Sequence, residues 1–359
     1  MSGSIEMKQD NPCVVLEKVG SIIYENRPVP EIKEQNYVKI AITHTGLCGS
    51  DVHYYETGCC GSFKVESPMV LGHESAGVIV EVGKDVTSLK VGDRVACEPG
   101  IPSRLSKEYK SGIYNLCPHM AFAATPPYDG TLCRYYLLPE DFCVKLPDNV
   151  SLEEGALVEP LSVGVHANRL ADVKFGDSML VFGAGPVGLL AAATAKAFGC
   201  SKVLLCDIIE EKLNFALDND MATHTFNTKG KSLDDLLEKI DEIWEGERPT
   251  VGIDATGNKF CISMCLSSLA NRGRYVQVGM GGDILDGFPI APVMERELKL
   301  MGSFRYGVGD YATSVELLKQ GKVKVKNLVT HRFKFEEAVE AYEFSQQGKS
   351  IKIMIEGPQ

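Results

Sequence analysis

Three residues of this sequence have the types and the spacing that suit a catalytic zinc ion. Cys48 lies in the segment TGLCGSD, and His73 and Glu74 open the run GHExxGxxxxxGxxV. A thiolate, a neutral imidazole and a carboxylate are all good zinc donors. Three protein donors leave the fourth position of a tetrahedral ion open to water or to an alcohol. The pattern therefore predicts a catalytic zinc site rather than a closed structural one.

Two side chains that follow the cysteine are spaced to carry a proton from an alcohol to solvent. Ser50 comes two residues after Cys48, and His53 comes five residues after it. A hydroxyl near the metal and an imidazole near water can relay a proton at neutral pH. Taken singly, each residue has a simpler explanation, because cysteine often serves as a small buried side chain and histidine often lies at the surface. The combination favours an enzyme.

A second motif predicts a dinucleotide site. The hexapeptide GAGPVG, from Gly183 to Gly188, has the form GxGxxG and lies between an apolar strand and a small-residue helix. The first glycine permits the tight turn, the second admits pyrophosphate to the backbone, and the third lets helix and strand pack closely. The start of the helix then offers free N–H groups to the phosphates. The simpler alternative is a tight turn without a ligand.

The acidic residue after the next strand favours NAD over NADP. Asp207 stands nineteen residues beyond Gly188, where a carboxylate can accept hydrogen bonds from both ribose hydroxyls and would repel a 2′-phosphate. Ile208 supplies no compensating cation, although Lys212 lies one turn further along the chain. An alternative role for Asp207 is to cap the next helix.

Length and composition narrow the class of protein. The chain has 359 residues, of which 44% are hydrophobic, so two domains are expected. The net charge of -11 argues against a nucleic-acid surface, which needs clustered lysine and arginine. Neither an export signal nor a membrane-spanning segment is visible, so the twelve cysteines are expected to be reduced thiols. We therefore expect a cytoplasmic protein that acts on a small molecule, without a nucleic-acid or membrane partner.

The order of the expected elements separates a β-rich part from an alternating part. The first 150 or so residues contain short expected strands between glycine and proline turns: Cys13 to Glu17, Tyr37 to Thr43, Val70 to Val82 and Arg94 to Cys97. From Ser178 onward, strands alternate with helices, which indicates a parallel sheet with crossover helices. The expected elements there include a strand at Met179 to Phe182, a helix at Leu233 to Trp244 and a strand at Tyr275 to Val278.

These motifs together resemble the zinc-containing medium-chain dehydrogenase/reductases, over essentially the whole chain. The resemblance is to the sorbitol and xylitol dehydrogenases in particular, above all those of yeasts, in four segments: Gly46 to Tyr55, Asn115 to Leu132, Val158 to His166 and Gly302 to Tyr306. It implies an α/β fold with a β-rich GroES-like catalytic domain, residues 1–160 and 300–359. A Rossmann domain with a doubly wound parallel sheet would occupy residues 161–299.

The resemblance also assigns roles to individual residues. It implies that Cys48, His73 and Glu74 hold zinc, and that Glu159 lies beside the metal as a ligand, as a substrate contact or as a catalytic aid. The residues that it places at the polyol are Tyr54, Phe122, Thr125, Glu159, Arg305 and Tyr306. The residues that motif and resemblance together place at NAD are Gly183, Gly185, Pro186, Val187, Gly188, Asp207, Lys212, Val278, Gly279, Met280, Ser303, Phe304 and Arg305. For Arg305, a surface ion pair or a subunit contact is the alternative.

One departure from the superfamily concerns its second, structural zinc. Members that have it carry four cysteines spaced as Cys, two residues, Cys, two residues, Cys, seven residues, Cys. Counting back from Cys117, this chain has Tyr109, Ser106 and Ser103 at the other three positions. A single thiolate cannot close a tetrahedral site. We therefore expect one zinc per subunit and a lobe that ordinary packing holds together.

These inferences predict a zinc-dependent, NAD-linked polyol dehydrogenase. The expected reaction is oxidation of xylitol to D-xylulose, and also of sorbitol to fructose. The alternatives are a zinc dehydrogenase for another alcohol, such as L-arabinitol or L-threonine, and a non-catalytic, nucleotide-sensing protein that keeps the fold. The resemblance implies a homotetramer, although no periodic apolar seam in the sequence demonstrates one.

Overall fold

The computed structural model describes residues 7–282 and 284–358, and contacts within the chain divide it into two compact units. Unit 1 comprises the residues up to Glu159 together with those from Val325 onward, and unit 2 comprises Pro160–Lys324. From the sequence, the second boundary is expected to follow residue 299. In the structure, the compact unit continues to Lys324. The reason is that residues 299–302 add a strand to the parallel sheet of unit 2.

Unit 1 is built from short strands, as the turn-rich sequence predicts. Its strands are β1 (Asn11–Lys18), β2 (Ser21–Arg27), β3 (Tyr37–Gly46), β4 (Cys59–Cys60), β5 (Phe63–Lys64), β6 (Met69–Val70), β7 (Glu74–Val82), β8 (Arg94–Cys97), β9 (Gly100–Ile101), β10 (Ala121–Phe122), β11 (Tyr135–Pro139), β12 (Cys143–Lys145), β19 (Val329–Phe333) and β20 (Lys352–Glu356). Its helices are α1 (Gly49–Thr57), α2 (Lys107–Lys110), α3 (Leu152–Ala156) and α11 (Ala338–Ser345), with short 3-10 turns at Tyr114–Leu116, Glu140–Phe142, Lys326–Leu328 and Phe335–Glu337.

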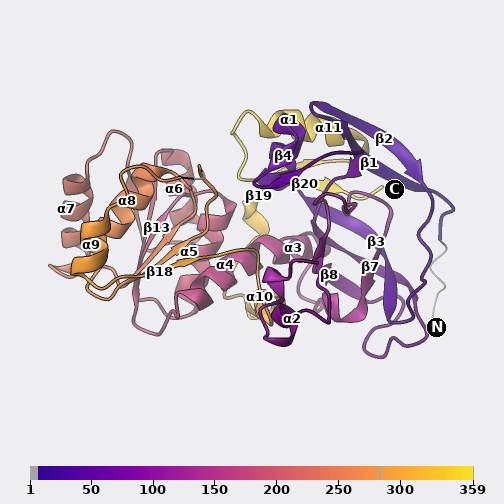
Figure 1. The fold of residues 1–359 in the computed structure, drawn as a ribbon, viewed down its shortest axis with the longest axis horizontal. Helices are drawn as coiled ribbons and strands as arrows, with labels where there is room; N and C mark the ends of the chain where they lie inside the picture. Colours follow the sequence, from indigo (N-terminus) through magenta and orange to yellow (C-terminus); the bar gives the residue numbers. More distant parts are fainter. Residues whose placement is uncertain (1–6, 283, 359) are drawn as a thin grey trace. The chain divides into compact units, whose positions relative to one another are not determined.

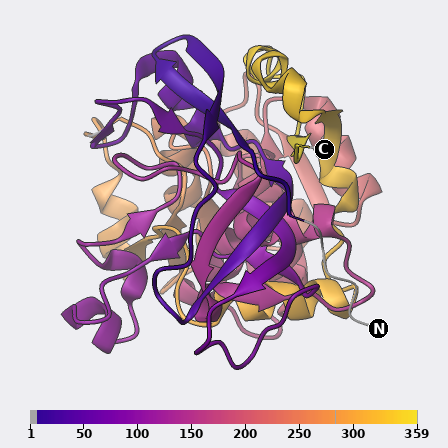
Figure 2. The same ribbon diagram turned by 90° about the vertical axis from the view of Figure 1, so that its right-hand side faces the viewer.

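The largest sheet of unit 1 joins the two ends of the chain. Its strand order is β12-β8-β7-β3-β20-β19, with β11 also paired to β3. The terminal strand β20 runs antiparallel to β3, with Met354 opposite Gly46. Figure 2 shows the yellow C-terminal segment of this unit together with its indigo and purple strands. The C-terminal residues therefore lie next to the end of β3, from which Cys48 follows.

The single strand expected over Val70 to Val82 is instead two strands with a break. β6 ends at Val70 and β7 begins at Glu74, and Gly72 between them has a φ of +89°. A Cβ atom at Gly72 would lie 2.8 Å from Leu132 Cγ and 2.9 Å from Thr45 Cγ2. Only glycine combines this backbone conformation with so close a neighbour. The break takes His73 out of the sheet's hydrogen-bond ladder.

Unit 2 alternates strands and helices. Its strands are β13 (Ser178–Phe182), β14 (Lys202–Asp207), β15 (His224–Asn227), β16 (Val251–Asp254), β17 (Arg274–Gln277) and β18 (Lys299–Gly302). Its helices are α5 (Pro186–Ala197), α6 (Glu210–Asp218), α7 (Leu233–Trp244), α8 (Lys259–Ser268), α9 (Ile290–Glu295) and α10 (Asp310–Lys319), while α4 (Val158–Leu170) begins in unit 1 and continues into unit 2. The helix at Leu233 to Trp244 has the bounds that the sequence predicts.

The sheet of unit 2 has the doubly wound Rossmann topology. All six strands are parallel, in the order β15-β14-β13-β16-β17-β18. The order reverses between β13 and β16, which is where such sheets bind a ligand, outside the carboxyl ends of the strands. Figure 1 shows helices α5, α6 and α8 around this sheet. None of the helices in the described ranges is long and apolar enough to span a membrane.

Helix α7 illustrates how the sequence specifies these elements. Ser232 caps its start, because its hydroxyl accepts a hydrogen bond from the Asp235 N–H at 3.2 Å while the Asp235 carboxylate accepts one from the Ser232 N–H at 2.8 Å. The buried residues recur at helical spacing along one face: Leu236, Ile240, Ile243 and Trp244. Such an amphipathic helix is stable only when that face packs on the sheet.

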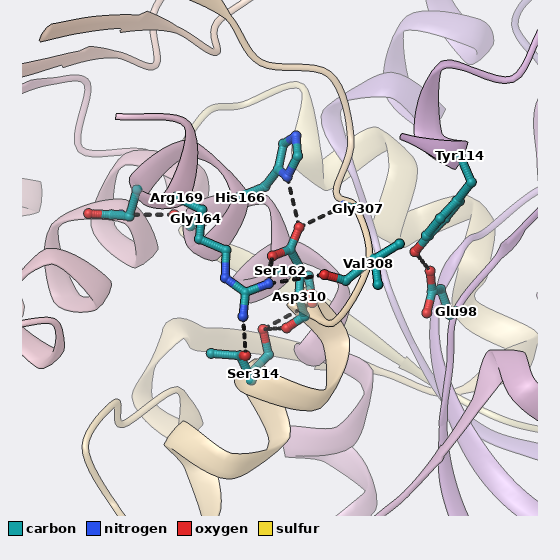
Figure 3. Close-up of polar contacts among 12 residues, drawn as sticks. Glu98, Tyr114, Ser162, Gly164, His166, Arg169, Gly307, Val308, Asp310 and Ser314 are labelled. Carbon is teal, nitrogen blue, oxygen red and sulfur yellow. Dashed lines mark hydrogen bonds and ion pairs between the residues drawn. The ribbon is translucent and has the colours of Figure 1, made fainter. Parts of the chain in front are cut away.

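The lobe that lacks three of the four cysteines is held by hydrogen bonds and aromatic packing. Ser106 and Tyr109 stand where zinc ligands would be, and the Ser106 hydroxyl accepts a hydrogen bond from the Tyr109 N–H at 3.1 Å, which caps α2. The Tyr114 hydroxyl donates to the buried Glu98 carboxylate (Figure 3), and its ring meets Phe142 edge-on at 5.9 Å. These contacts cross-link the lobe to the main sheet.

We expect Tyr114→Phe to destabilise unit 1 by about 1–3 kcal/mol, because a buried carboxylate loses a hydroxyl donor. Urea denaturation of the metal-loaded protein would measure the change. Tyr109→Phe is the matched control, since its hydroxyl contacts Arg104 at the surface and should contribute less than about 0.5 kcal/mol. Equal effects of the two substitutions would contradict this account of the lobe.

Candidate metal and cofactor sites

The structure brings the three predicted zinc ligands together in unit 1. Ligand atoms of Cys48, His73 and Glu74 all lie within 4.8 Å of one another. Cys48 precedes the first residue of α1, and His73 follows the break before β7, whose first residue is Glu74. A Cβ atom at Gly46, opposite Glu74 in the sheet, would lie 2.2 Å from Glu74 Oε2, so glycine here leaves room for the carboxylate in its observed position.

The imidazole of His73 is placed as a metal ligand would be. It is buried, and its Nδ1 makes no hydrogen bond, although Asp51 Oδ1 lies 3.4 Å away. Burial alone lowers the pKa of His73, but the negative charges of Asp51 and Cys48 outweigh it and raise that pKa well above its usual value. The donors thus form a negatively charged cluster that attracts a cation. A carboxylate beside one ring nitrogen is a common second partner of zinc-binding histidine. The residues fit zinc.

Lys352 is a functional residue that the sequence analysis missed. Its buried ammonium lies 2.7 Å from each oxygen of the Glu74 carboxylate and 3.1 Å from the Leu47 carbonyl. Burial lowers the pKa of Lys352, but Glu74 and other negative groups outweigh this and raise it overall. The only clue in the sequence was the presence of a positively charged residue at the start of the largely apolar terminal strand KIMIE. Asp51, three residues after Cys48, was missed as well.

The other predicted residues of unit 1 surround this cluster in different ways. The Phe122 ring lies 5.7 Å from the His73 ring, between centroids. The buried Tyr54 hydroxyl hydrogen-bonds Thr125, and burial raises the pKa of Tyr54 to about 12. Glu159, in the first turn of α4, is buried and is not one of the three residues with clustered ligand atoms, but its charge helps to raise the pKa of Lys352.

The two residues proposed for proton relay both lie on α1. Ser50 is half-buried and His53 is exposed. Tyr54 follows them on the same helix and points its ring into the core instead. On α1, the Tyr54 side chain is therefore buried, the Ser50 side chain half-buried and the His53 side chain exposed.

In unit 2 the three glycines of the motif have different surroundings. Gly183 has a φ of +100°, and a Cβ atom at Gly188 would lie 1.8 Å from the Gly183 carbonyl oxygen. By contrast, a Cβ atom at Gly185 would meet nothing within 4 Å. Pro186 then occupies the first turn of α5, next to Val187. The space above Gly185 is open for a phosphate to approach the backbone and the helix N-terminus.

Asp207 lies at the end of β14, as predicted, and is tied to the glycine turn. Its Oδ2 accepts a hydrogen bond from the Ala184 N–H at 2.6 Å, and its Oδ1 accepts one from the Ile209 N–H at 2.9 Å. The carboxylate is half-buried at the same edge of the sheet as Gly185. Lys212 is half-buried in the first turns of α6.

The remaining predicted cofactor residues follow β17 and β18 at that same edge. Val278, Gly279 and the exposed Met280 follow β17, and Ser303, Phe304 and Arg305 follow β18. Asp254, which the sequence analysis missed, organises the first group. Its buried carboxylate accepts hydrogen bonds from Thr256, Gly257 and Gln277, and its carbonyl accepts the Val278 and Gly279 N–H groups.

The family of the chain follows from comparison with known proteins. Residues 34–148 match the family described as "Alcohol dehydrogenase GroES-like domain", and residues 186–320 match "Zinc-binding dehydrogenase". The chain belongs to these zinc-binding, GroES-like alcohol dehydrogenases. It is therefore an oxidoreductase whose cofactors are zinc and a nicotinamide dinucleotide, which confirms the predicted class and fold.

Among individual relatives, polyol enzymes are prominent. "Sorbitol dehydrogenase 2" of Saccharomyces cerevisiae is 54% identical over 98% of this chain and 99% of its own length. "D-xylulose reductase" of Scheffersomyces stipitis is 51% identical over 97% of this chain and 99% of its own. In the solved structure of Escherichia coli galactitol-1-phosphate dehydrogenase, with a TM-score of 0.87 and 28% identity, the similarity covers 96% of this chain and 99% of that one.

We predict that Gly185→Ala weakens NADH binding at least tenfold without unfolding the protein. The methyl group meets no protein atom at an ordinary φ of -76°, so stability should fall by less than about 1 kcal/mol, whereas the methyl group blocks the approach of pyrophosphate. Fluorescence titration with NADH and thermal unfolding would measure the two effects. Unchanged NADH affinity in a folded variant would refute the placement of the phosphates.

We also predict that Lys352→Met lowers the stability of the zinc-free protein by about 3–5 kcal/mol, because Glu74 loses its buried cation. Zinc should restore more stability to this variant than to the parent, since the ion then compensates the carboxylate. Calorimetric unfolding with and without zinc measures both. Lys39→Met is the matched control: Lys39 is equally buried in the same sheet, and its partner Glu81 is half-exposed. A similar zinc response in all three proteins would contradict the prediction.

Proposed function

We propose that the protein is an NAD-dependent polyol dehydrogenase that oxidises xylitol to D-xylulose and also accepts sorbitol, giving fructose. The observation that carries the proposal is the cluster of Cys48, His73 and Glu74, with the Tyr54–Thr125 pair and Phe122 around it. The names of the sorbitol dehydrogenase and D-xylulose reductase relatives support the choice of substrate.

The chemistry divides between the cofactors and the chain. When bound, zinc polarises the alcohol oxygen as a Lewis acid and NAD accepts the hydride. Cys48, His73 and Glu74 would hold the metal, Asp51 would fix the His73 ring, and Lys352 would keep the Glu74 carboxylate in place. The substrate loses one hydride from carbon and one proton from its hydroxyl.

The proton and the substrate hydroxyls are handled by side chains of this chain. The Ser50 hydroxyl would accept the substrate proton while it gives its own proton to the His53 imidazole, which then releases a proton to solvent. The Glu159 carboxylate, near Lys352, is assigned to assist this transfer. The Tyr54 phenol stays protonated at neutral pH and can donate a hydrogen bond to a polyol hydroxyl. Arg305 and Tyr306 of unit 2 would bind further hydroxyls, because a guanidinium offers several fixed donors.

The choice of NAD over NADP is assigned to Asp207. Its carboxylate can accept hydrogen bonds from both ribose hydroxyls and would repel a 2′-phosphate. The glycine turn, Lys212 and the residues after β17 and β18 complete the proposed cofactor contacts. We further propose one zinc per subunit, a homotetramer and a cytoplasmic location; the capped helix at Ser106 and Tyr109 supports the first of these.

We predict that Cys48→Ala and His73→Ala each remove zinc and abolish polyol oxidation, with kcat/KM reduced at least about a thousandfold, as expected for loss of a Lewis acid. The dissociation constant of NADH should stay within about threefold of the parent value, because the glycine motif belongs to the other unit. Metal analysis should find one zinc per parent subunit. A zinc-free Cys48→Ala protein that oxidises xylitol at the parent rate would refute the mechanism.

A substrate panel tests the specificity in the same preparation. Values of kcat/KM for xylitol, sorbitol, L-arabinitol and L-threonine, each with NAD and with NADP, should be highest for xylitol with NAD. A preference for L-arabinitol or L-threonine would keep the class of enzyme but change its substrate. Binding of NADH without turnover of any alcohol would instead favour a nucleotide-sensing protein.

A further inference from the structure

A polar network in unit 2 holds the segment that carries Arg305 and Tyr306. At its centre is Asp310, the first residue of α10, whose side chain is almost wholly buried. Its Oδ2 accepts the Gly307 N–H at 2.6 Å and lies 2.8 Å from His166 Nδ1, while its Oδ1 accepts Arg169 Nη1 at 2.5 Å. Figure 3 shows these groups converging on the one carboxylate.

The partners of Asp310 come from helix α4 and from the segment itself. Arg169 also donates to the Val308 carbonyl at 3.2 Å and to the Thr313 hydroxyl at 2.6 Å, so one guanidinium joins α4, the segment and α10. Beside it, the Ser162 and Ser314 hydroxyls lie 3.0 Å apart. A buried carboxylate with this many donors fixes the backbone around it far more firmly than a surface ion pair would.

The segment between β18 and α10 contains a strained residue. Arg305 has a φ of +58°, a conformation that residues other than glycine rarely adopt and that persists only where neighbouring contacts enforce it. On one side, the Ser303 N–H donates to the Gln277 carbonyl at 2.8 Å. On the other side, the buried Tyr306 ring packs on Tyr311 at 5.0 Å, and Asp310 binds the Gly307 N–H. Arg305 is thus clamped between the sheet and α10.

We infer that Asp310, held by Arg169 and His166, is a positioning residue that fixes Arg305 and Tyr306 for substrate binding. The inference rests on the proposed function, which assigns polyol contacts to these two residues. The Asp310 carboxylate is engaged by Gly307, His166 and Arg169, so it acts through the backbone at Gly307. Gly307 follows Arg305 by two residues, and the Arg305 guanidinium lies over the Phe304 ring at 4.7 Å.

The test compares Asp310→Asn with Asp177→Asn. The first variant keeps the shape of the side chain but replaces a charged acceptor with a group that turns an N–H toward donors. The second removes an ion pair of similar kind in the same unit, because the partly buried Asp177 binds Arg274 at 2.6 Å, the Thr250 hydroxyl at 2.8 Å and the Lys174 N–H at 2.7 Å. Asp177 precedes β13, at the opposite end of the strands from the glycine turn.

Hydrogen exchange measured by mass spectrometry should show residues 303–309 exchanging about tenfold faster in Asp310→Asn, the change expected for losing one such bond, and unchanged in Asp177→Asn. For xylitol, Asp310→Asn should raise KM about tenfold while kcat stays within about threefold. The NADH dissociation constant should rise about threefold, because Ser303 and Phe304 lie in the same segment. Both variants should lower the melting temperature similarly.

Three results would overturn the inference: exchange in residues 303–309 that does not change in Asp310→Asn, exchange that rises without any change in KM, or a rise in KM that Asp177→Asn reproduces. If the parent protein oxidises no polyol, the proposed function fails on its own. In that case, the positioning role of Asp310 is tested by hydrogen exchange in residues 303–309 and by the NADH dissociation constant. The role is refuted if either quantity in Asp310→Asn equals that of the parent protein.

Discussion

Buried negative charge is the constraint on which unit 1 depends. The Glu74 and Asp51 carboxylates and the Cys48 side chain lie around His73, in a region from which water is largely excluded. Burying like charges together is unfavourable unless cations compensate them. Lys352 compensates Glu74 with two contacts of 2.7 Å, and the remaining negative charge is what raises the pKa of His73. A divalent cation at this point satisfies the cluster as a whole, so electrostatics and the proposed chemistry require the same ion.

Close approach of other atoms to the backbone is the second requirement, and glycine meets it at both sites. Gly46 leaves space for the Glu74 carboxylate, and Gly188 packs its α-carbon against the Gly183 carbonyl. Gly185 differs from both, because the space beside it is open. The same residue type thus serves packing at two positions and ligand access at a third. This distinction between the glycines is visible in the structure, whereas the sequence supplies only the motif.

The sequence predicts best what short, local patterns determine. The glycine motif lies within one strand–turn–helix unit, and the periodicity of α7 is complete within twelve residues, so both could be assigned directly. Lys352 could not, because it meets Glu74 across 278 positions of sequence. The strand break at Gly72 and the position of the domain boundary after Lys324 were not predicted, for related reasons. The break depends on contact with Thr45 and Leu132, and the boundary depends on β18, a four-residue strand of mixed composition.

The carboxylates of unit 2 are stabilised differently from those of unit 1. Asp207, Asp254 and Asp310 each accept hydrogen bonds from backbone N–H groups of a segment that carries predicted cofactor or substrate residues. Such N–H groups lie beyond the ends of the strands, where the sheet offers them no carbonyl partner. A carboxylate can accept several of them at once, and hydrogen bonds to a charged acceptor are stronger than those between neutral groups. Three aspartates can therefore hold three segments of unit 2 in place through backbone N–H groups. In unit 1, by contrast, the buried Glu74 carboxylate is compensated by a side chain, the Lys352 ammonium.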